Sequence, residues 1–306
     1  MLPRTHWLRY IAGLDPETDY EEIYRVTVTH EFPWDMNQAL SFALFRTYAV
    51  PSIGRLLHET GEFTARTQKR YDDTALLLDA ASVDGLHSER GRRAIRRINQ
   101  MHRAYDISDA DMRYVLSTFV VVPRRWIDEY GWRPLTPAEV RAGTRYYQEL
   151  GRLLGVRDIP ATYEEFATLL DDHEAEHFGF DPGGRRVADA TMALMTTFYP
   201  RPLRRPVALA ARALMDEPLR EAFGYAAPPR ALVRAARGGL RARARAERAL
   251  PARRRPLRVE DLRWIRSYPD GYEVEELGTF PGGCPVPRTS GRAGSAQRGQ
   301  RLVERR

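Results

Sequence analysis

The sequence predicts an all-α protein, built as one multi-helix domain that ends in a basic helix and a disordered tail. Three observations support this fold class. Apolar residues recur at intervals of three and four over most of the 306 residues, the spacing of one face of an α-helix. Helix-capping motifs precede several of these stretches. No series of alternating strand patterns joined by Asn-Gly turns occurs.

Six segments show the helical period most clearly, and motifs at their starts support the assignment. Thr136 and Glu139 form a capping box with proline at the first helical position, and Thr162 and Glu165 repeat the box. The six predicted helices cover residues 63–81, 89–105, 108–122, 136–154, 162–177 and 185–199.

Other local signals mark where helices stop and where strands are conceivable. Gly85 and Gly155 fall where a helix is expected to end. Residues 26–29 and 272–277 carry the β-branched and aromatic residues typical of short strands, although neither stretch has an evident partner.

The chain is expected to form one helical domain at residues 20–280, after a short lead-in at 1–19. No Pro/Gly-rich linker divides residues 20–225, which favours one domain over two. Residues 257–277 regain aromatic and apolar content, and we expect them to pack back onto the domain. Residues 281–306 are mostly Gly, Pro, Ser and Arg, a composition typical of a disordered tail.

The formal net charge of +7 is concentrated near the C-terminus. Residues 230–258 contain eleven arginines and one acid, and residues 288–306 contain six arginines and one acid, so the rest of the chain is net negative. Residues 230–249 form a predicted Ala/Arg helix, which Gly238 and Gly239 weaken in the middle. Its arginines recur at helical spacing, at Arg230, Arg234, Arg237, Arg241, Arg245 and Arg248.

This basic stripe is either a solvated helix face or a surface for anionic lipid headgroups or nucleic acid. The sequence shows no helix-turn-helix pattern, zinc finger or stacking platform, so sequence-specific recognition of nucleic acid is not expected. Peripheral contact of residues 230–258 with an anionic membrane is the functional alternative to a solvated face.

The composition, with 43% hydrophobic and 29% charged residues, is that of a folded globular protein. The longest apolar stretch, residues 114–123, is about half the ~20 residues that a membrane-spanning helix needs. Charged residues stand where a signal peptide would have its apolar segment. The single cysteine, Cys284, cannot form an intramolecular disulfide. We therefore expect a cytoplasmic protein, with or without peripheral attachment to a membrane.

The five residues from His173 to His177 read His-Glu-Ala-Glu-His, which matches the H-E-x-x-H pattern. On a helix this pattern places both histidines on one face for zinc, with Glu174 as general base. However, Asp171 and Asp172 crowd the motif with charge, and the further glycine and histidine of the extended pattern are missing. A solvated acidic helix end explains the segment equally well.

A second candidate site involves His102, Arg70 and Thr74. His102 lies on or beside the apolar stripe of its predicted helix, as a hydrogen-bonded core residue or as an axial haem ligand. As such a ligand, it would need an acceptor for its second ring nitrogen, such as Asp106 or a carbonyl one turn earlier. Arg70 and Thr74, four residues apart, share one helix face. The alternatives are an inward-facing pair or, for Arg70, an ion pair with an aspartate at the surface.

Seven short motifs follow one another between residues 33 and 136. The most distinctive, at residues 122–136, combines two Trp, one Tyr and three Arg in a turn-rich stretch that by itself most often locks helices together. The other six motifs are residues 33–35, 45–47, 57–63, 70–74, 99–102 and 111–116. In this order the motifs resemble the MpaB / rubber-oxygenase (latex-clearing protein) family of haem b oxygenases.

The resemblance implies an all-α, globin-like core that carries haem b (iron protoporphyrin IX). By the same resemblance, His102 matches the axial ligand of the haem iron, and Arg70 and Thr74 match the polar pair on the distal side. Rubber-cleaving members have a lysine immediately before the threonine, whereas this chain has Asp73. A carboxylate there is expected to change the charge and proton handling of the pocket.

The family implies an oxidoreductase, a haem-dependent oxygenase that acts with dioxygen on an apolar, isoprenoid-like unsaturated substrate. Two alternatives stay open. One is a non-catalytic helical protein that binds a lipid or a partner through its basic region. The other is a zinc hydrolase that uses His173, Glu174 and His177.

Overall fold

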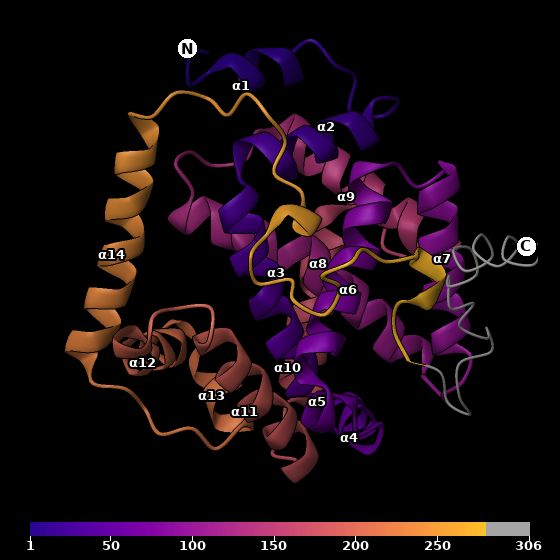
Figure 1. Ribbon diagram of the computed structural model, residues 1–306, viewed down its shortest axis with the longest axis vertical. Helices are drawn as coiled ribbons and strands as arrows, with labels where there is room; N and C mark the ends of the chain where they lie inside the picture. Colours follow the sequence, from indigo (N-terminus) through magenta and orange to yellow (C-terminus); the bar gives the residue numbers. More distant parts are fainter. Residues whose placement is uncertain (280–306) are drawn as a thin grey trace, which may run out of the picture.

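The computed structural model describes residues 1–279, and helices make up most of this part of the chain (Figure 1). The only β pairing among the described residues is an isolated bridge between Leu2 and Ala252. The helices are α1 (His6–Ile11), α2 (Tyr20–Val26), α3 (Pro33–Tyr48), α4 (Pro51–Glu59), α5 (Glu62–Ala65), α6 (Thr67–Val83), α7 (Glu89–His102), α8 (Asp109–Tyr130), α9 (Pro137–Leu153), α10 (Tyr163–His177), α11 (Pro182–Thr196), α12 (Arg204–Leu214), α13 (Glu217–Ala222) and α14 (Arg230–Arg248). Short helical turns cover Thr27–Glu31, Arg201–Leu203, Val259–Asp261 and Val274–Glu276.

The predicted all-α fold is confirmed, with shifts at some helix ends. Thr136 and Glu139 form the predicted capping box at the start of α9. The first predicted helix is divided into α5 and α6, because Arg66 leaves the helical backbone conformation with φ of −135°. Helix α8 continues past its predicted end and includes Pro123. Helix α7 ends at His102, so the histidine lies on a helix terminus rather than inside a helix.

The two conceivable strands are helical turns. Residues Thr27–Glu31 form a π-helical turn that continues α2. Two β-branched residues of this stretch, Thr27 and Thr29, bond back to the chain: their hydroxyls donate to the carbonyls of Ile23 and Arg25, at 2.8 and 2.7 Å. These local bonds satisfy the threonines within a helical backbone. Near the C-terminus, Val274–Glu276 is a 3₁₀ turn that packs on α7.

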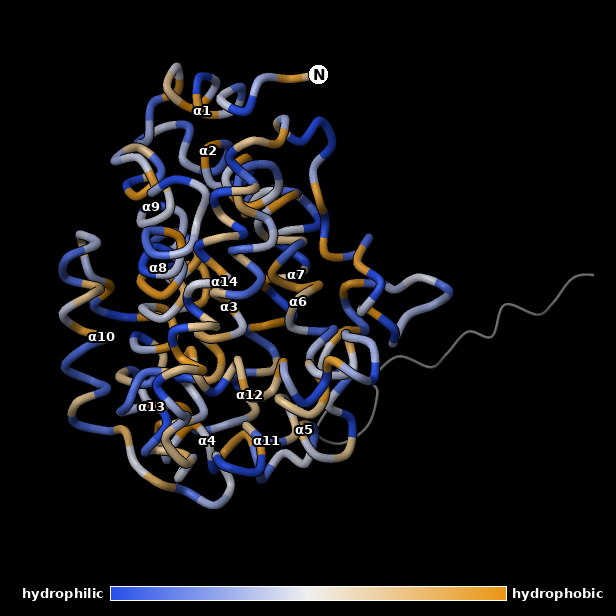
Figure 2. The backbone as a smooth tube through the Cα atoms, turned by 90° about the vertical axis from the view of Figure 1, so that its left-hand side faces the viewer, coloured by the Kyte–Doolittle hydropathy of each residue, from blue (hydrophilic) through white to orange (hydrophobic). Residues whose placement is uncertain are grey.

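The main core lies where α3 crosses α8, with α2, α9 and α10 around them. Apolar stretches of the chain gather toward this interior around α3 and α8 (Figure 2). Trp126 of α8 stacks on Phe42 of α3, and its indole N–H donates to the buried carboxylate of Asp35 at 3.2 Å. A fully buried large apolar side chain contributes roughly 1.5–3 kcal/mol. The motifs that contain Asp35 and Trp126 therefore hold α3 against α8.

The crossing of α4 and α11 depends on two glycines. A Cβ atom at Gly54 would lie 2.7 Å from the Cα of Gly184 and 2.4 Å from the carbonyl oxygen of Tyr48. No larger side chain fits between the two backbones at this point. The close approach places the start of α4, and with it one wall of the cavity described below, against α11.

Residues 257–279, which we call the strap, pack back over α6 and α7, as the sequence predicts. In Figure 1 the strap runs in yellow across the front of the molecule from the end of α14 to α7. The carboxylate of Asp72 on α6 accepts hydrogen bonds from the backbone N–H groups of Arg266 and Ser267 and from the Ser267 hydroxyl. The carboxylate of Asp79 accepts from the backbone N–H of Val259 at 3.0 Å.

Helix α14 forms an arm along one side of the molecule and contacts α8 and α12 (Figure 1). The helix is continuous through Gly238 and Gly239. Of the described helices, none is long and apolar enough to cross a lipid bilayer. The predicted disordered tail, residues 281–306, lies outside the described residues.

Candidate cofactor site

A cavity of about 300 Å³ lies between α4, α6, α7 and α8. This volume is near the lower end of the range for pockets that enclose a drug-sized ligand, roughly 300–1,000 Å³. Its wall is mostly apolar, and it includes His102 from the end of α7 together with Arg70 and Thr74 from α6. The structure therefore brings the three predicted site residues to one cavity.

His102 faces this cavity without a polar partner. Its Nδ1 atom is buried and has no hydrogen bond, so the acceptor expected from Asp106 or a backbone carbonyl is not found among the described residues. Burial lowers the pKa of the imidazole to about 4, and the positive charge of Arg70 acts in the same direction. The ring is therefore neutral at pH 7 and has a lone pair available, which is the form that binds a metal.

Arg70 and Thr74 form a local pair on the cavity side of α6. The guanidinium donates to the Thr74 hydroxyl oxygen, and that hydroxyl donates to the Arg70 carbonyl at 3.0 Å. The guanidinium carbon also lies 5.1 Å from the ring centre of Phe63. Arg70 makes no ion pair with a described residue, so the surface Arg–Asp pair is not formed. The Arg70 cation consequently faces an apolar cavity.

Asp73 does not line the cavity. Its carboxylate is 1% exposed, accepts from the Lys69 ammonium at 2.8 Å and accepts from the hydroxyl of Tyr268 on the strap. Asp73 is therefore outside the cavity wall, because its carboxylate is bonded to Lys69 and to the strap instead. Burial and the neighbouring carboxylate raise the pKa of Tyr268, so its hydroxyl keeps the proton that it donates.

The cavity wall also includes polar residues that the sequence did not single out. Tyr48 from α3, Glu62 from α5 and Asp111 from α8 line it, and Thr279 reaches it from the strap. Glu62 is bonded to Arg66 one turn later. Glu62 and Asp111 lie within two of the seven motifs, which is the signal that could have found them. Thr279 carries no such signal.

The H-E-x-x-H segment does not assemble a zinc site. The Glu174 carboxylate is bonded to Arg46 and accepts from the Tyr114 hydroxyl at 3.2 Å, so it is held inside the bundle. The rings of His173 and His177 stack at 4.2 Å, and His173 Nε2 lies 3.8 Å from Asp111. Among the described residues no group of three or more His, Cys, Asp or Glu is arranged to hold a metal ion.

The fold and the cavity define a class of protein: an all-α protein with an apolar internal cavity, in which one neutral histidine faces an arginine–threonine pair. Within this class, the family model described as the catalytic domain of the ER-bound oxygenase mpaB/B′ and rubber oxygenase matches residues 35–249. The match covers most of the chain, and the chain belongs to this family.

Two fungal relatives and one solved structure illustrate the relationship. The chain is 34% identical over 217 residues to the ER-bound oxygenase mpaB′ of Penicillium brevicompactum, a match that covers 65% of this chain and 51% of the relative. It is 33% identical over 229 residues to the ER-bound oxygenase mpaB of Penicillium roqueforti, covering 68% of this chain and 76% of the relative. The chain thus spans about half the length of the first relative and three quarters of the second.

The solved structure is that of a latex clearing protein in its closed state. It superposes with a TM-score of 0.54 at 18% identity, over 78% of this chain and 68% of the other. At this identity the likeness concerns the fold.

Proposed function

We propose that this chain is a haem b-dependent oxygenase, an oxidoreductase that acts with dioxygen on an apolar, unsaturated, isoprenoid-like substrate. The observation that carries the proposal is the buried, unpartnered Nδ1 of His102 in the wall of an apolar cavity. A buried polar atom without a partner costs roughly 1–3 kcal/mol, and a group bound at this nitrogen would remove that cost. The family description and the names of the two fungal relatives support an oxygenase.

The residues present suit a haem group. His102 would hold the iron through a neutral imidazole, and apolar side chains such as Leu77, Met101 and Val115 would surround the porphyrin. When bound, haem supplies the oxygen-activating chemistry, while the protein supplies binding, orientation and electrostatics.

Arg70 and Thr74 would act on the oxygen atoms that become negatively charged during the reaction. The Arg70 guanidinium would donate hydrogen bonds toward the cavity, where it would stabilise developing negative charge on oxygen. Its effect is larger in a water-poor cavity than in water, because the surrounding dielectric is low. The Thr74 hydroxyl, which already donates to the Arg70 carbonyl, can turn toward the cavity and donate a hydrogen bond there.

The apolar wall favours a hydrocarbon-like substrate. Adding both atoms of one dioxygen molecule across a carbon–carbon double bond breaks that bond and gives two carbonyl groups. This reaction balances without an external reductant. The sequence resemblance supports an isoprenoid-like skeleton, and the lining of the cavity is compatible with it.

The experiment that tests the proposal is a titration of the purified chain with haemin. A Soret band at one haem per chain is expected, followed by oxygen consumption and carbonyl products with a polyunsaturated isoprenoid such as squalene. Saturable haem binding without oxygen consumption would contradict the oxygenase proposal. A chain that binds no haem would contradict both parts and favour the non-catalytic helical protein.

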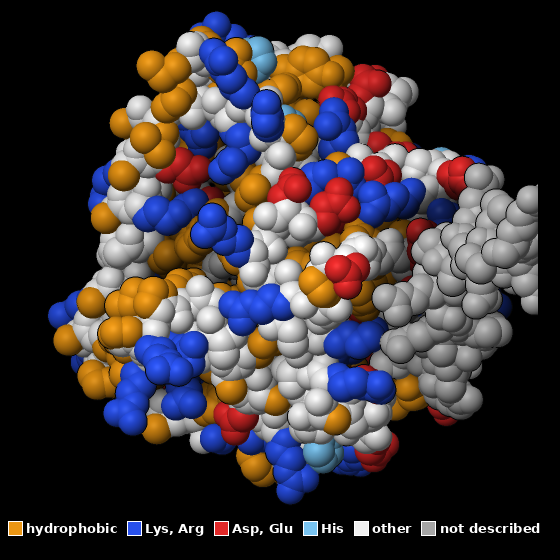
Figure 3. All heavy atoms as spheres, viewed as in Figure 1, with side chains coloured by type: hydrophobic (Ala, Val, Ile, Leu, Met, Phe, Trp, Pro, Cys, Tyr) orange, Lys and Arg blue, Asp and Glu red, His pale blue; other side chains and the backbone are white. Residues whose placement is uncertain are grey.

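A second proposal concerns the partner of the arm. We propose that α14 contacts an anionic membrane surface, because Arg230, Arg234 and Arg245 are exposed and make no ion pair with described residues. Along the side formed by α14, Figure 3 shows basic side chains with hydrophobic side chains between them. Other arginines of the stripe are already used: Arg241 pairs with Glu129 at 3.0 Å.

Sedimentation with vesicles tests this contact. The full chain is expected to bind vesicles with 30% phosphatidylserine, a composition of about one anionic lipid in three, and to dissociate as salt screens the charges. Changing Arg230, Arg234 and Arg245 to Glu should abolish binding, whereas the same change at Arg241 should have a smaller effect. Equal binding by both variants would contradict the proposal. Truncation before α14 is a poor test, because it also removes the strap.

A further inference from the structure

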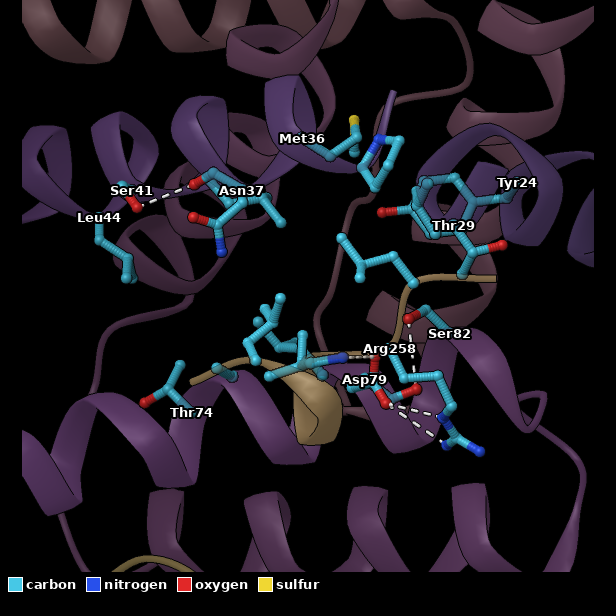
Figure 4. A pocket seen from close by; sticks show the side chains of 18 of the residues that line it. Tyr24, Thr29, Met36, Asn37, Ser41, Leu44, Thr74, Asp79, Ser82 and Arg258 are labelled. Atoms are coloured by element: carbon cyan, nitrogen blue, oxygen red, sulfur yellow. Dashed lines mark hydrogen bonds and ion pairs between the residues drawn. The ribbon is translucent and has the colours of Figure 1, made fainter. Parts of the chain in front are cut away.

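A second, smaller chamber of about 120 Å³ adjoins the cofactor cavity (Figure 4). The two spaces have part of their lining in common. These shared residues are Leu44, Tyr71, Thr74, Leu78 and Leu150. In Figure 4 Thr74 lies on α6 at one end of the chamber, with Asn37, Ser41 and Leu44 on α3 opposite. Thr74 is thus the candidate site residue that touches both spaces.

The strap closes this chamber. Leu257, Arg258, Val259 and Leu262 form part of its wall, although they follow Thr74 by more than 180 positions. Hydrogen bonds hold this wall in place: the backbone N–H of Leu257 donates to the Thr29 carbonyl at 3.0 Å, and that of Val259 donates to Asp79 at 3.0 Å. The size of the chamber therefore depends on strap side chains.

Most polar groups around the chamber already have partners. The hydroxyls of Tyr24 and Tyr147 bond to each other at 2.7 Å, and the Ser41 hydroxyl donates to the Asn37 carbonyl at 2.8 Å. The Asp79 carboxylate is bonded to the strap. A polar ligand would find few free donors or acceptors here, so the remaining surface selects an apolar group.

We propose that this chamber binds the apolar end group of the substrate beside Thr74, and that Leu262 on the strap limits the size of that group. An apolar cavity of about 150 Å³ holds a benzene molecule, so the chamber suits about five carbons, one isoprene unit. The inference rests on the proposed function, because it places the substrate next to a residue of the candidate cofactor site.

Two substitutions at Leu262 test the chamber in opposite directions. Leu262→Trp fills it, and Leu262→Ala enlarges it. Arg263→Trp is the matched control, because this neighbouring strap residue is exposed and does not line the chamber. The first readout is calorimetric binding of geraniol, a ten-carbon isoprenoid alcohol, to the haem-loaded chain. The second is the position of xenon in crystals pressurised with the gas.

Leu262→Trp should weaken geraniol binding about tenfold, the loss expected from roughly two buried methylene groups, and should exclude xenon from the chamber. Leu262→Ala should bind a bulkier cyclic terpenoid alcohol more tightly than the parent chain does. Arg263→Trp should match the parent in both readouts. Unchanged geraniol affinity in both Leu262 variants, or xenon that never enters the chamber of the parent, would overturn the proposal.

The haemin titration distinguishes failure of the proposed function from failure of the chamber proposal. If the parent chain binds no haem, the proposed function fails, and geraniol binding to the haem-free chain still decides whether Leu262 controls an apolar site. If haem binds normally in all variants while geraniol affinity ignores Leu262, the chamber proposal fails and the proposed function stands.

Discussion

The polar side chains of α6 that face the strap and those that face the cavity differ in how fully they are hydrogen-bonded. On the strap face, Asp72, Asp73 and Asp79 are almost fully buried, and each accepts several hydrogen bonds. On the cavity face, Arg70 and Thr74 bond mainly to each other, and the neighbouring His102 has a buried nitrogen with no partner. The polar groups between α6 and the strap thus have hydrogen-bond partners, whereas the polar groups at the cavity are only partly paired.

This difference predicts which substitutions on α6 affect stability and which affect function. A carboxylate that accepts three or four hydrogen bonds fixes the strap, and removing it leaves buried donors unpaired. A polar group without a partner at a cavity costs stability and is retained where a ligand completes it. We therefore expect substitutions on the strap face to change the free energy of unfolding, and those on the cavity face to change haem binding and turnover.

The largest expected effect on the cavity face is that of His102→Ala. Removing the imidazole takes away the candidate iron ligand, so the Soret band should disappear in a haemin titration while far-UV circular dichroism stays unchanged. His177→Ala is the control, because its ring is 44% exposed and is not part of the cavity wall. Full haem content in His102→Ala would show that the imidazole does not hold the haem. It would also contradict the assignment of function to the cavity face.

Changing the polar pair should affect turnover rather than haem content. Arg70→Gln and Thr74→Val should each keep the Soret band and lower the rate of oxygen consumption, by about 10²–10³-fold for the lost cation. Arg96→Gln on α7 serves as the control for charge removal, because this side chain is exposed and does not line the cavity. Rates equal to those of the parent chain would show that the pair is structural.

Asp73→Lys tests the strap face of α6, because it introduces the lysine that rubber-cleaving members of the family have at this position. The new ammonium would be buried beside Lys69 and Tyr268, so the free energy of unfolding should fall by about 3–5 kcal/mol in urea titrations. Asp73→Asn should cost less, because the amide can still accept from Tyr268. A change in the haem spectrum with stability unchanged would place this side chain in the cavity instead.

The smallest effect is a difference in pH dependence at Asp79. Burial beneath the strap raises the pKa of this carboxyl group. The folded state then holds the proton more tightly than the unfolded state, so its contribution to stability falls as pH rises from about 3.8 through the raised pKa. In urea titrations between pH 4 and pH 7, Asp79→Asn should show less of this fall than the parent chain. A steeper fall would contradict the assignment.

Local signals predicted the fold class and most helices. The capping residues Thr136 and Thr162 act within one turn, so the sequence alone places them correctly. The spacing of Arg70 and Thr74 places both on one helix face, and the order of motifs connects them to His102. These predictions depend on short sequence distances or on resemblance.

Non-local contacts account for what the sequence could not predict. The direction of Asp73 is decided by Tyr268, nearly two hundred residues later, and no local pattern reveals that pairing. The second chamber depends in the same way on Leu262. At residues 26–29 the deciding contacts are local instead. The hydroxyls of Thr27 and Thr29 bond to carbonyls of the preceding turn, and these bonds override the strand propensity of the stretch.

The bond between Asp72 and Ser267 joins residues 195 positions apart, and this has a consequence for biosynthesis. Helices α6 and α7 leave the ribosome early, but the side of α6 that faces the strap stays uncovered until residue 267 has also emerged. Nascent chains shorter than this expose three aspartates and the apolar surface beside them. The wall of the candidate cavity, which includes Thr279, is therefore completed only after residue 279 has emerged and the strap closes over the first half of the protein.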